Sequence, residues 1–425
     1  MSQRSTPLGL ALAFLGAASL LLAVLFDRVE LLVVAAPLLV PVMRAGFGQA
    51  PVRFRLTLSL SDDRASEGEQ VRLSMKVAAM TDVPATEILH ELPPLLEPVA
   101  GDHHAVVHLK SGETAEWSVD LLCRARGEVA LGVFLIRRWH RSGAAIEEVL
   151  HRAPQRLKIY PRVVPLRRVP RPLKTRSSFG NHVAPKLGQG IEPGDIRAFA
   201  PGDRLRQINW QASLRFRRLY VTQFHEERAA DIVLLLDTAG DVGRRPSSSL
   251  DISVRTAAAL ATAYLAQRDR VGLIKYSGSI EWIRPGSGRR QIEVLMEALM
   301  TSATNASYGF EDLDFVPPKV LPQGALVIAM SALVDGRFLK VVTELRARGF
   351  DVVLLALAPL SLMAGPPGPK GVDDLARRLW RVERQASLES LARRGLQVVE
   401  IEPDQPLDGV IAPLLRRRFR HGVRA

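Results

Sequence analysis

An uncharged apolar run near the N-terminus constrains this chain more than any other feature. The run extends from Leu8 to Phe26 over 19 residues; as an α-helix it would be roughly 28 Å long, about the thickness of a bilayer's hydrocarbon core. A second apolar run, Leu31 to Met43, follows a short acidic loop and contains Pro37 and Pro41. A signal peptide is the alternative, but no A-x-A cleavage pattern precedes the loop. We therefore expect a transmembrane helical hairpin over residues 1–49.

The charges that flank the two runs predict how the hairpin is oriented. Arg4 precedes the first run, and Arg44, Arg53 and Arg55 follow the second, whereas the loop between the runs is net acidic. Because positive flanks stay on the cytoplasmic side, we expect both ends of the hairpin, and everything after it, to face the cytoplasm.

Residues 50–160 have the alternating pattern of short strands. Val52–Leu60 and Val71–Val77 alternate between apolar and polar residues, and Gly, Asp and Ser separate the later segments. This pattern predicts a β-sandwich, and we find no catalytic constellation in it. A Pro- and Arg-rich segment, Pro161–Arg176, then begins a basic linker over residues 161–228.

The positive charge of the chain is concentrated in that linker. The 425 residues carry a net charge of +13, and the segment from Arg162 to Tyr220 holds thirteen Lys or Arg residues and three acidic ones. Such a block permits binding to anionic lipid or nucleic acid. We do not expect nucleic acid, because the few aromatic residues are interleaved with apolar ones rather than arranged for base stacking. The single cysteine, Cys123, excludes a disulfide within the chain.

Residues 229–425 alternate strand and helix patterns. Ile232 to Asp237 is an apolar run that ends on an acidic residue, as a buried parallel strand does. The alternation predicts an open α/β fold, a doubly wound sheet with helices on both faces. Ligands of such sheets bind at the carboxyl ends of the strands, which is where Asp237 lies.

The segment before this sheet contains a distinctive tight turn, Ala200–Asp203. Pro201 presets φ and Gly202 can adopt a positive φ. Asp203 can accept two N–H groups from an arginine, and Trp210 can cover the pair. We expect a fixed polar network here.

This segment closely resembles the signature of a bacterial family known as domain of unknown function fifty-eight, whose core reads approximately R-x-[YF]-x-P-G-D-x-x-R-x-I-[DN]-W. Asn209 stands where the family commonly has Asp. The signature residues that we take as candidates for interaction are Arg197, Phe199, Pro201, Gly202, Asp203, Arg206, Asn209, Trp210, Arg215, Glu226 and Glu227.

The resemblance extends to the order of the parts and carries several implications. It implies that the α/β domain is von Willebrand factor A-like. It also implies a protein of the bacterial inner membrane that works with a MoxR-type AAA+ ATPase on a client protein.

In von Willebrand factor A-like domains, a metal-ion-dependent adhesion site begins D-x-S-x-S at the end of the first strand. Here Asp237 is present, Ala239 cannot bind a metal, and Asp241 keeps an oxygen. The site also uses an acidic residue from a later loop, expected directly after Ser331. In this chain that position is Ala332, and Asp335 lies three residues further on. Mg²⁺ requires several oxygen ligands in a near-octahedral array. We therefore expect a degenerate site without a cofactor, and Mg²⁺ held by Asp237 and Asp241 is the alternative.

A second polar loop precedes a predicted helix at Ser287. The G-x-S-x-G spacing of a nucleophile elbow fails here, so we interpret Ser287 as a helix N-cap. No complete catalytic constellation is found, and we predict a membrane-anchored adaptor rather than an enzyme. Two alternatives remain: a metal-dependent enzyme that uses the strand-end acids, and a module that binds anionic lipid or nucleic acid through the basic segment.

Overall fold

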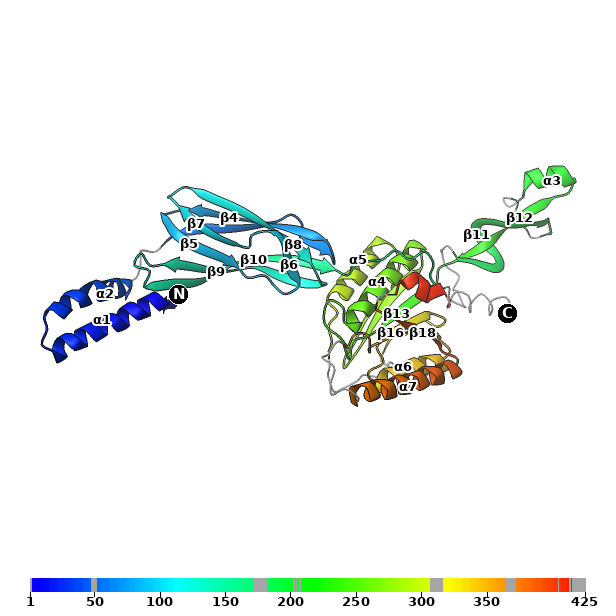
Figure 1. The fold of residues 1–425 in the computed structure, drawn as a ribbon. Coiled ribbons are helices and arrows are strands. Elements are labelled where there is room, and N and C mark those ends of the chain that lie inside the picture. The colour runs from blue at the N-terminus through cyan, green and yellow to red at the C-terminus, as the bar shows by residue number, and fades with distance from the viewer. Residues whose placement is uncertain are drawn as a thin grey trace. The chain divides into compact units, whose positions relative to one another are not determined.

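The structure is a computed structural model that describes residues 2–46, 52–170, 182–201, 203, 205, 208–305, 316–363, 372–403, 405–412 and 414. Of residues 2–3, 46, 182–195, 223–228 and 372–373 it describes only the backbone. The chain forms two compact units, Met1–Tyr160 and Pro161–Ala425, each of which is described by itself (Figure 1).

Two helices begin the first unit. Helix α1 (Pro7–Leu25) starts at Thr6, whose side chain accepts a hydrogen bond from the Gly9 amide, and α2 (Glu30–Gly46) contains Pro37 and Pro41. Within the described part of the chain, α1 alone is long and apolar enough to cross a bilayer, with a mean hydropathy of 2.5.

The two helices pack closely against each other. A Cβ added at Gly16 would lie 2.5 Å from Cγ of Leu39, so a larger residue at this position would force Leu39 to move. Ser19 Oγ also donates a hydrogen bond to the Leu31 carbonyl.

A short strand, β1 (Ser2–Ser5), precedes α1 and pairs antiparallel with β10. No pattern in the sequence predicts this strand. Near it, the Thr6 amide donates to the Ala144 carbonyl, and Ser142 Oγ donates to the Pro41 carbonyl. The helices are therefore attached to one turn of the following β domain.

The β domain consists of two sheets around one core, as the alternating pattern predicts. The strand order is β1-β10-β9-β5-β7 in one sheet, with β3 also paired to β10, and β2-β4-β8-β6 in the other. Fully buried side chains from both sheets, such as Leu73, Leu121, Phe134 and Leu157, form one cluster. The strands are β2 (Phe54–Leu60), β3 (Arg64–Ser66), β4 (Gln70–Ala79), β5 (Val83–His90), β6 (Leu96–Gly101), β7 (His104–Leu109), β8 (Thr114–Cys123), β9 (Gly127–Trp139) and β10 (Ala145–Tyr160).

The second unit is built on a sheet with the order β15-β14-β13-β16-β17-β18. All neighbouring strands are parallel except β15, which is antiparallel to β14. Its elements are β13 (Asp231–Asp237), α4 (Ser249–Ala266), β14 (Arg270–Tyr276), β15 (Ile280–Gly286), α5 (Arg289–Met300), β16 (Leu326–Ser331), α6 (Gly336–Ala347), β17 (Asp351–Leu357), α7 (Val372–Arg393) and β18 (Gln397–Ile401).

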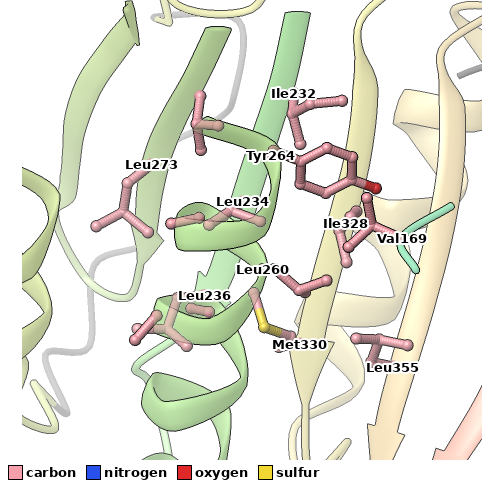
Figure 2. Packing of buried hydrophobic residues seen from close by; sticks show 14 of the residues in the cluster. Val169, Ile232, Leu234, Leu236, Leu260, Tyr264, Leu273, Ile328, Met330 and Leu355 are labelled. Atoms are coloured by element: carbon pink, nitrogen blue, oxygen red, sulfur yellow. The ribbon is translucent and has the colours of Figure 1, made fainter. Parts of the chain in front are cut away.

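Helices cover both faces of this sheet, which confirms the predicted α/β arrangement. Alternate residues of β13 enter separate cores. Ile232 and Leu234 pack with Tyr264 of α4 (Figure 2), whereas Val233 and Leu235 pack with Phe338 of α6. All seven residues of β13 are buried.

The first part of the basic linker packs onto this core. Val169 is buried among the side chains of the sheet (Figure 2), and the Tyr264 hydroxyl donates a hydrogen bond of 2.6 Å to the Pro170 carbonyl. The Arg167 amide donates to Oδ1 of Asp408. Residues 161–170 are thus part of the second unit.

The signature segment forms a separate two-stranded antiparallel sheet. Strand β11 (His182–Ala198) pairs with β12 (Tyr220–Arg228). The short helix α3 (Trp210–Phe216) lies between them in the chain.

Candidate functional site

Asp237 occupies the strand end that the sequence analysis singled out. It is the last residue of β13, which has β14 on one side and β16 on the other. The chain continues from β13 to β14 in one direction and from β16 to β17 in the other. This topological switch point is where open α/β sheets bind ligands.

The carboxylate of Asp237 is buried and internally hydrogen-bonded. Its side chain accepts a hydrogen bond from Ser331 Oγ at 2.5 Å and another from the Ala239 amide at 3.1 Å. Burial raises the pKa of Asp237 to about 6, and the nearby charge of Asp335 adds to this increase in the pKa. At neutral pH this carboxylate is an anion held by two donors of the protein itself.

Ser331 connects Asp237 to the following loop. While donating to Asp237, its Oγ accepts a hydrogen bond from the Leu333 amide at 2.8 Å. Leu333 has a φ of 55°, in the left-handed region that costs energy for a residue with a side chain. The loop after β16 is therefore fixed to the end of β13.

The second candidate metal ligand, Asp241, serves the start of α4. Its Oδ1 accepts hydrogen bonds of 2.9 Å from Ser249 Oγ and from the Leu250 amide. Both donors belong to the first turn of the helix, whose amides have no partner within the helix. The carboxylate also suits the positive end of the helix dipole.

Asp335 likewise has a structural partner. It is the N-cap of α6 and accepts from the Arg337 amide at 2.9 Å. The Arg337 guanidinium donates to both of its carboxylate oxygens, and this hydrogen bonding lowers the pKa of Asp335.

These contacts allow a test of whether the strand end fits Mg²⁺. The carboxylate of Asp237 accepts hydrogen bonds from Ser331 and Ala239, and Oδ1 of Asp241 accepts hydrogen bonds from α4. Ala239, which lies between the two acids in the sequence, has no side-chain oxygen. In the described residues there is no group of three His, Cys, Asp or Glu side chains that could hold a metal ion. The residues present do not fit a hard divalent cation, which needs several available oxygens.

Arg384 of α7, which was not among the predicted site residues, contacts the same edge of the sheet. Its guanidinium donates to the carbonyls of Ala332 and Leu357, and forms an ion pair of 3.0 Å with Glu400. Its side chain is only 8% exposed. Nothing in the sequence around Arg384 distinguishes it from the other arginines of this helix.

The interpretation of Ser287 as an N-cap is wrong. The N-cap of α5 is Gly288, which has a φ of 83° and makes no side-chain capping hydrogen bond. Glycine suits this N-cap position because residues with a Cβ avoid the backbone conformation that Gly288 adopts.

In the signature segment, the expected pairing of Asp203 with an arginine is present. Arg197 donates to both carboxylate oxygens of Asp203, at 2.7 and 2.6 Å, and the Ala200 amide donates at 2.8 Å. These hydrogen bonds lower the pKa of Asp203. Trp210, expected to cover the pair, leaves 64% of its surface exposed.

Asn209 and Ser213 fix α3 to β12. Asn209 is the N-cap: its Oδ1 accepts from the Ala212 amide at 3.0 Å and its Nδ2 donates to Thr222 Oγ1 at 3.1 Å. Ser213 Oγ accepts from the Tyr220 amide at 2.9 Å. The N-cap preference for Asn could have identified this role from sequence.

The remaining signature residues are placed as follows. Phe199 pairs through its amide with the Leu219 carbonyl, while Pro201 and Arg215 are exposed. Glu226 and Glu227 lie on β12, where only their backbone is described, and Gly202 and Arg206 fall outside the described residues.

Comparisons with known proteins identify a family and several relatives. The model of the family described as "Protein of unknown function DUF58" matches residues 195–358. An uncharacterized protein of Mycobacterium tuberculosis (strain ATCC 25618 / H37Rv) is 26% identical over 125 residues, which are 29% of this chain and 39% of that protein. An uncharacterized protein of Mycobacterium bovis gives the same values.

Solved structures are similar to about a quarter of the chain. The cupredoxin domain of amoB from Nitrosocaldus yellowstonii is 10% identical with a TM-score of 0.19, covering 26% of this chain and 90% of that one. The C-terminal domain of wzt is 13% identical with the same TM-score, covering 26% and 75%. Similarity at this level supports no conclusion about fold or function. The stretch that contains both the Arg197–Asp203 pair and the Asp237–Ser331 contact, residues 195–358, therefore matches the family described as "Protein of unknown function DUF58".

Proposed function

We propose that this protein is a membrane-anchored adaptor whose α/β unit is a von Willebrand factor A-like interaction domain. The observation that carries the proposal is the sheet order β15-β14-β13-β16-β17-β18, with one antiparallel edge strand and helices on both faces. That arrangement supports the likeness expected from the signature. In this proposal the strand-end loops serve for binding, as they do in such domains.

The acidic side chains at this edge of the sheet already have partners within the protein, which favours binding over catalysis. Asp237 is held by Ser331, Asp241 by α4 and Asp335 by Arg337. A general base or nucleophile needs a group that is free to react with a substrate. These carboxylates instead stabilise the loops, and the loops present exposed side chains such as Val334.

The anchor is the N-terminal pair of helices. The apolar character of α1 supports one span, and the packing of α2 against it supports a return span. Together with the arginines on the outer flanks, this leads us to place two spans in the bacterial inner membrane, with both units in the cytoplasm.

We further propose that the partner is a MoxR-type AAA+ ATPase, which would act on a client protein at the membrane. This part rests on the family resemblance. The strand-end loops around Val334 are the proposed docking face.

Affinity purification from membranes tests the proposal. The tagged full chain is compared with V334E, which places a charge on a side chain that is 60% exposed. The matched control is V106E in β7, where the valine is 62% exposed on the other unit. We expect mass spectrometry to identify the ATPase with the wild type and V106E, and a strong loss of it with V334E.

Two results would count against the proposal in different ways. Recovery of only lipids or unrelated enzymes with the wild type would reject the adaptor function. Equal recovery of the ATPase with V334E would reject the strand-end face as the docking surface.

A further inference from the structure

Helix α3 and its flanks expose several large apolar side chains. We call this set the α3 surface: Leu205, Trp210, Leu214, Phe216 and Leu219, which are 72%, 64%, 79%, 57% and 44% exposed. Trp210 and Leu214 are four residues apart, so they lie on the same side of the helix. Ser213, in the same helix, is buried and accepts a hydrogen bond from the Tyr220 amide of β12. Several large apolar side chains exposed within one short segment indicate a binding surface.

The same segment is strongly basic. Residues 204–225 contain five arginines and no acidic residue. Arg215, Arg217 and Arg218 are exposed, and among the described residues they form no ion pair. The guanidinium of Arg215 lies 5.9 Å from the centre of the Phe216 ring, so an aromatic ring and a cation are presented together.

The α3 surface is held in a defined conformation. Asn209 caps the helix, Ser213 ties it to the Tyr220 amide, and Arg197 pairs with Asp203 across the preceding turn. The exposed side chains are therefore mounted on fixed backbone, which reduces the conformational entropy lost on binding.

We propose that the α3 surface docks onto an anionic lipid bilayer, with Trp210 and Leu214 at the boundary between headgroups and acyl chains. Trp, Phe and Leu beside arginines is the composition of segments that lie in this boundary. The arginine stems pack along apolar surface while their guanidinium groups reach the phosphates.

The second argument for a bilayer is that the chain carries its own candidate anchor. If α1 spans a membrane, the bilayer is always present at a high effective concentration, so a weak second contact is enough. This argument rests on the membrane anchoring in the proposed function, whereas the charge and exposure of the α3 surface do not. The α3 surface is distinct from the strand-end loops around Val334.

A fluorescent probe at position 214 tests the inference. The full chain, held in an amphipathic polymer, carries L214C labelled with NBD, and V106C labelled in the same way is the control. Cys123 is fully buried, so it is protected from labelling. The labelled chains are mixed with vesicles of phosphatidylcholine alone or with added phosphatidylglycerol.

We expect a blue shift and increased emission at position 214 with the anionic vesicles only, quenching by nitroxide lipids, and no change at position 106. The triple variant R215E/R217E/R218E should abolish the shift. High salt should weaken it, because salt screens exposed charges. An unchanged spectrum at position 214, an equal response to neutral vesicles, or a shift with single-stranded RNA but not with lipid would overturn the inference.

Failure of the anchor is tested separately, by reconstituting the wild-type chain from detergent into neutral vesicles, without the polymer, and then floating the vesicles. A chain that does not float after this reconstitution has no membrane anchor. The probe at position 214 still reports on the α3 surface in that case, because the anionic vesicles are added from outside.

Discussion

Ser331 Oγ donates a hydrogen bond to Oδ2 of Asp237, a residue 94 positions earlier in the chain and one strand away in the sheet. The contact joins the ends of the two strands that flank the switch point. It also explains how a carboxylate that is only 8% exposed can remain there as an anion, because a buried charge requires hydrogen-bond donors.

Removing the hydroxyl should destabilise the strand ends. In S331A, Asp237 keeps only the Ala239 amide as a donor and the Leu333 amide loses its acceptor. We expect a loss of about 1–3 kcal/mol, the cost of leaving a buried group unsatisfied. Hydrogen exchange of the amides of β13 and β16 in the full chain measures it.

The double variant D237N/S331A gives the control for this prediction. If the hydrogen bond is the cause, S331A should cost clearly less in the D237N background than in the wild type. Equal costs in both backgrounds would assign the effect to the Leu333 amide or to packing.

The raised pKa of Asp237 predicts a pH dependence of stability. Its pKa is about 6 in the folded protein against 3.8 for the unperturbed group, so the folded state holds this proton more tightly. The contribution of this proton to the stability of the folded state is fully present below pH 4 and is lost as the pH rises through about 6. The shift corresponds to about 3 kcal/mol.

D237N isolates this contribution, because asparagine does not titrate. We expect the difference in thermal midpoint between the wild type and D237N to change between pH 4 and pH 6 and to be constant above pH 7. A difference that does not vary with pH would show that Asp237 has an ordinary pKa.

Asp241 should act as a helix-capping residue rather than a metal ligand. D241A removes the acceptor for the Leu250 amide and should cost about 1 kcal/mol, whereas D241N keeps an acceptor oxygen and should cost less. For the wild type, we expect the same thermal midpoint in Mg²⁺, in Mn²⁺ and in EDTA. Stabilisation by either metal that disappears in D237N would contradict this prediction.

Asn209 should be replaceable by Asp but not by Ala. N209D keeps the oxygen that caps α3 and loses only the donation to Thr222, and Asp is common at this signature position. N209A loses both contacts and should cost about 1 kcal/mol. Limited proteolysis at Arg215 of α3, and at Arg217 and Arg218 just after it, measures this. Cleavage should be faster in N209A than in N209D, and equal rates would reject the capping role.

Local patterns were sufficient to predict most elements. The apolar run before Asp237 predicts a buried strand and the period-two segments predict the sheets of the β domain, because side-chain burial follows directly from these periods. The pairing of Asp203 with an arginine was also expected, since arginines lie close to it in the sequence and match its carboxylate in charge and geometry.

The partners of the strand-end residues were decided only by the tertiary structure. Asp237 and Asp241 are close in sequence, yet one bonds to a serine on a neighbouring strand and the other to the first turn of α4. The hydrogen bond between Tyr264 and Pro170 could not be predicted from the sequence either. The same holds for the hydrogen bonds of Arg384 to the carbonyls at two strand ends. Periodicity reports which side of an element is buried, whereas a hydrogen bond between distant residues depends on how strands are ordered and on which loops meet.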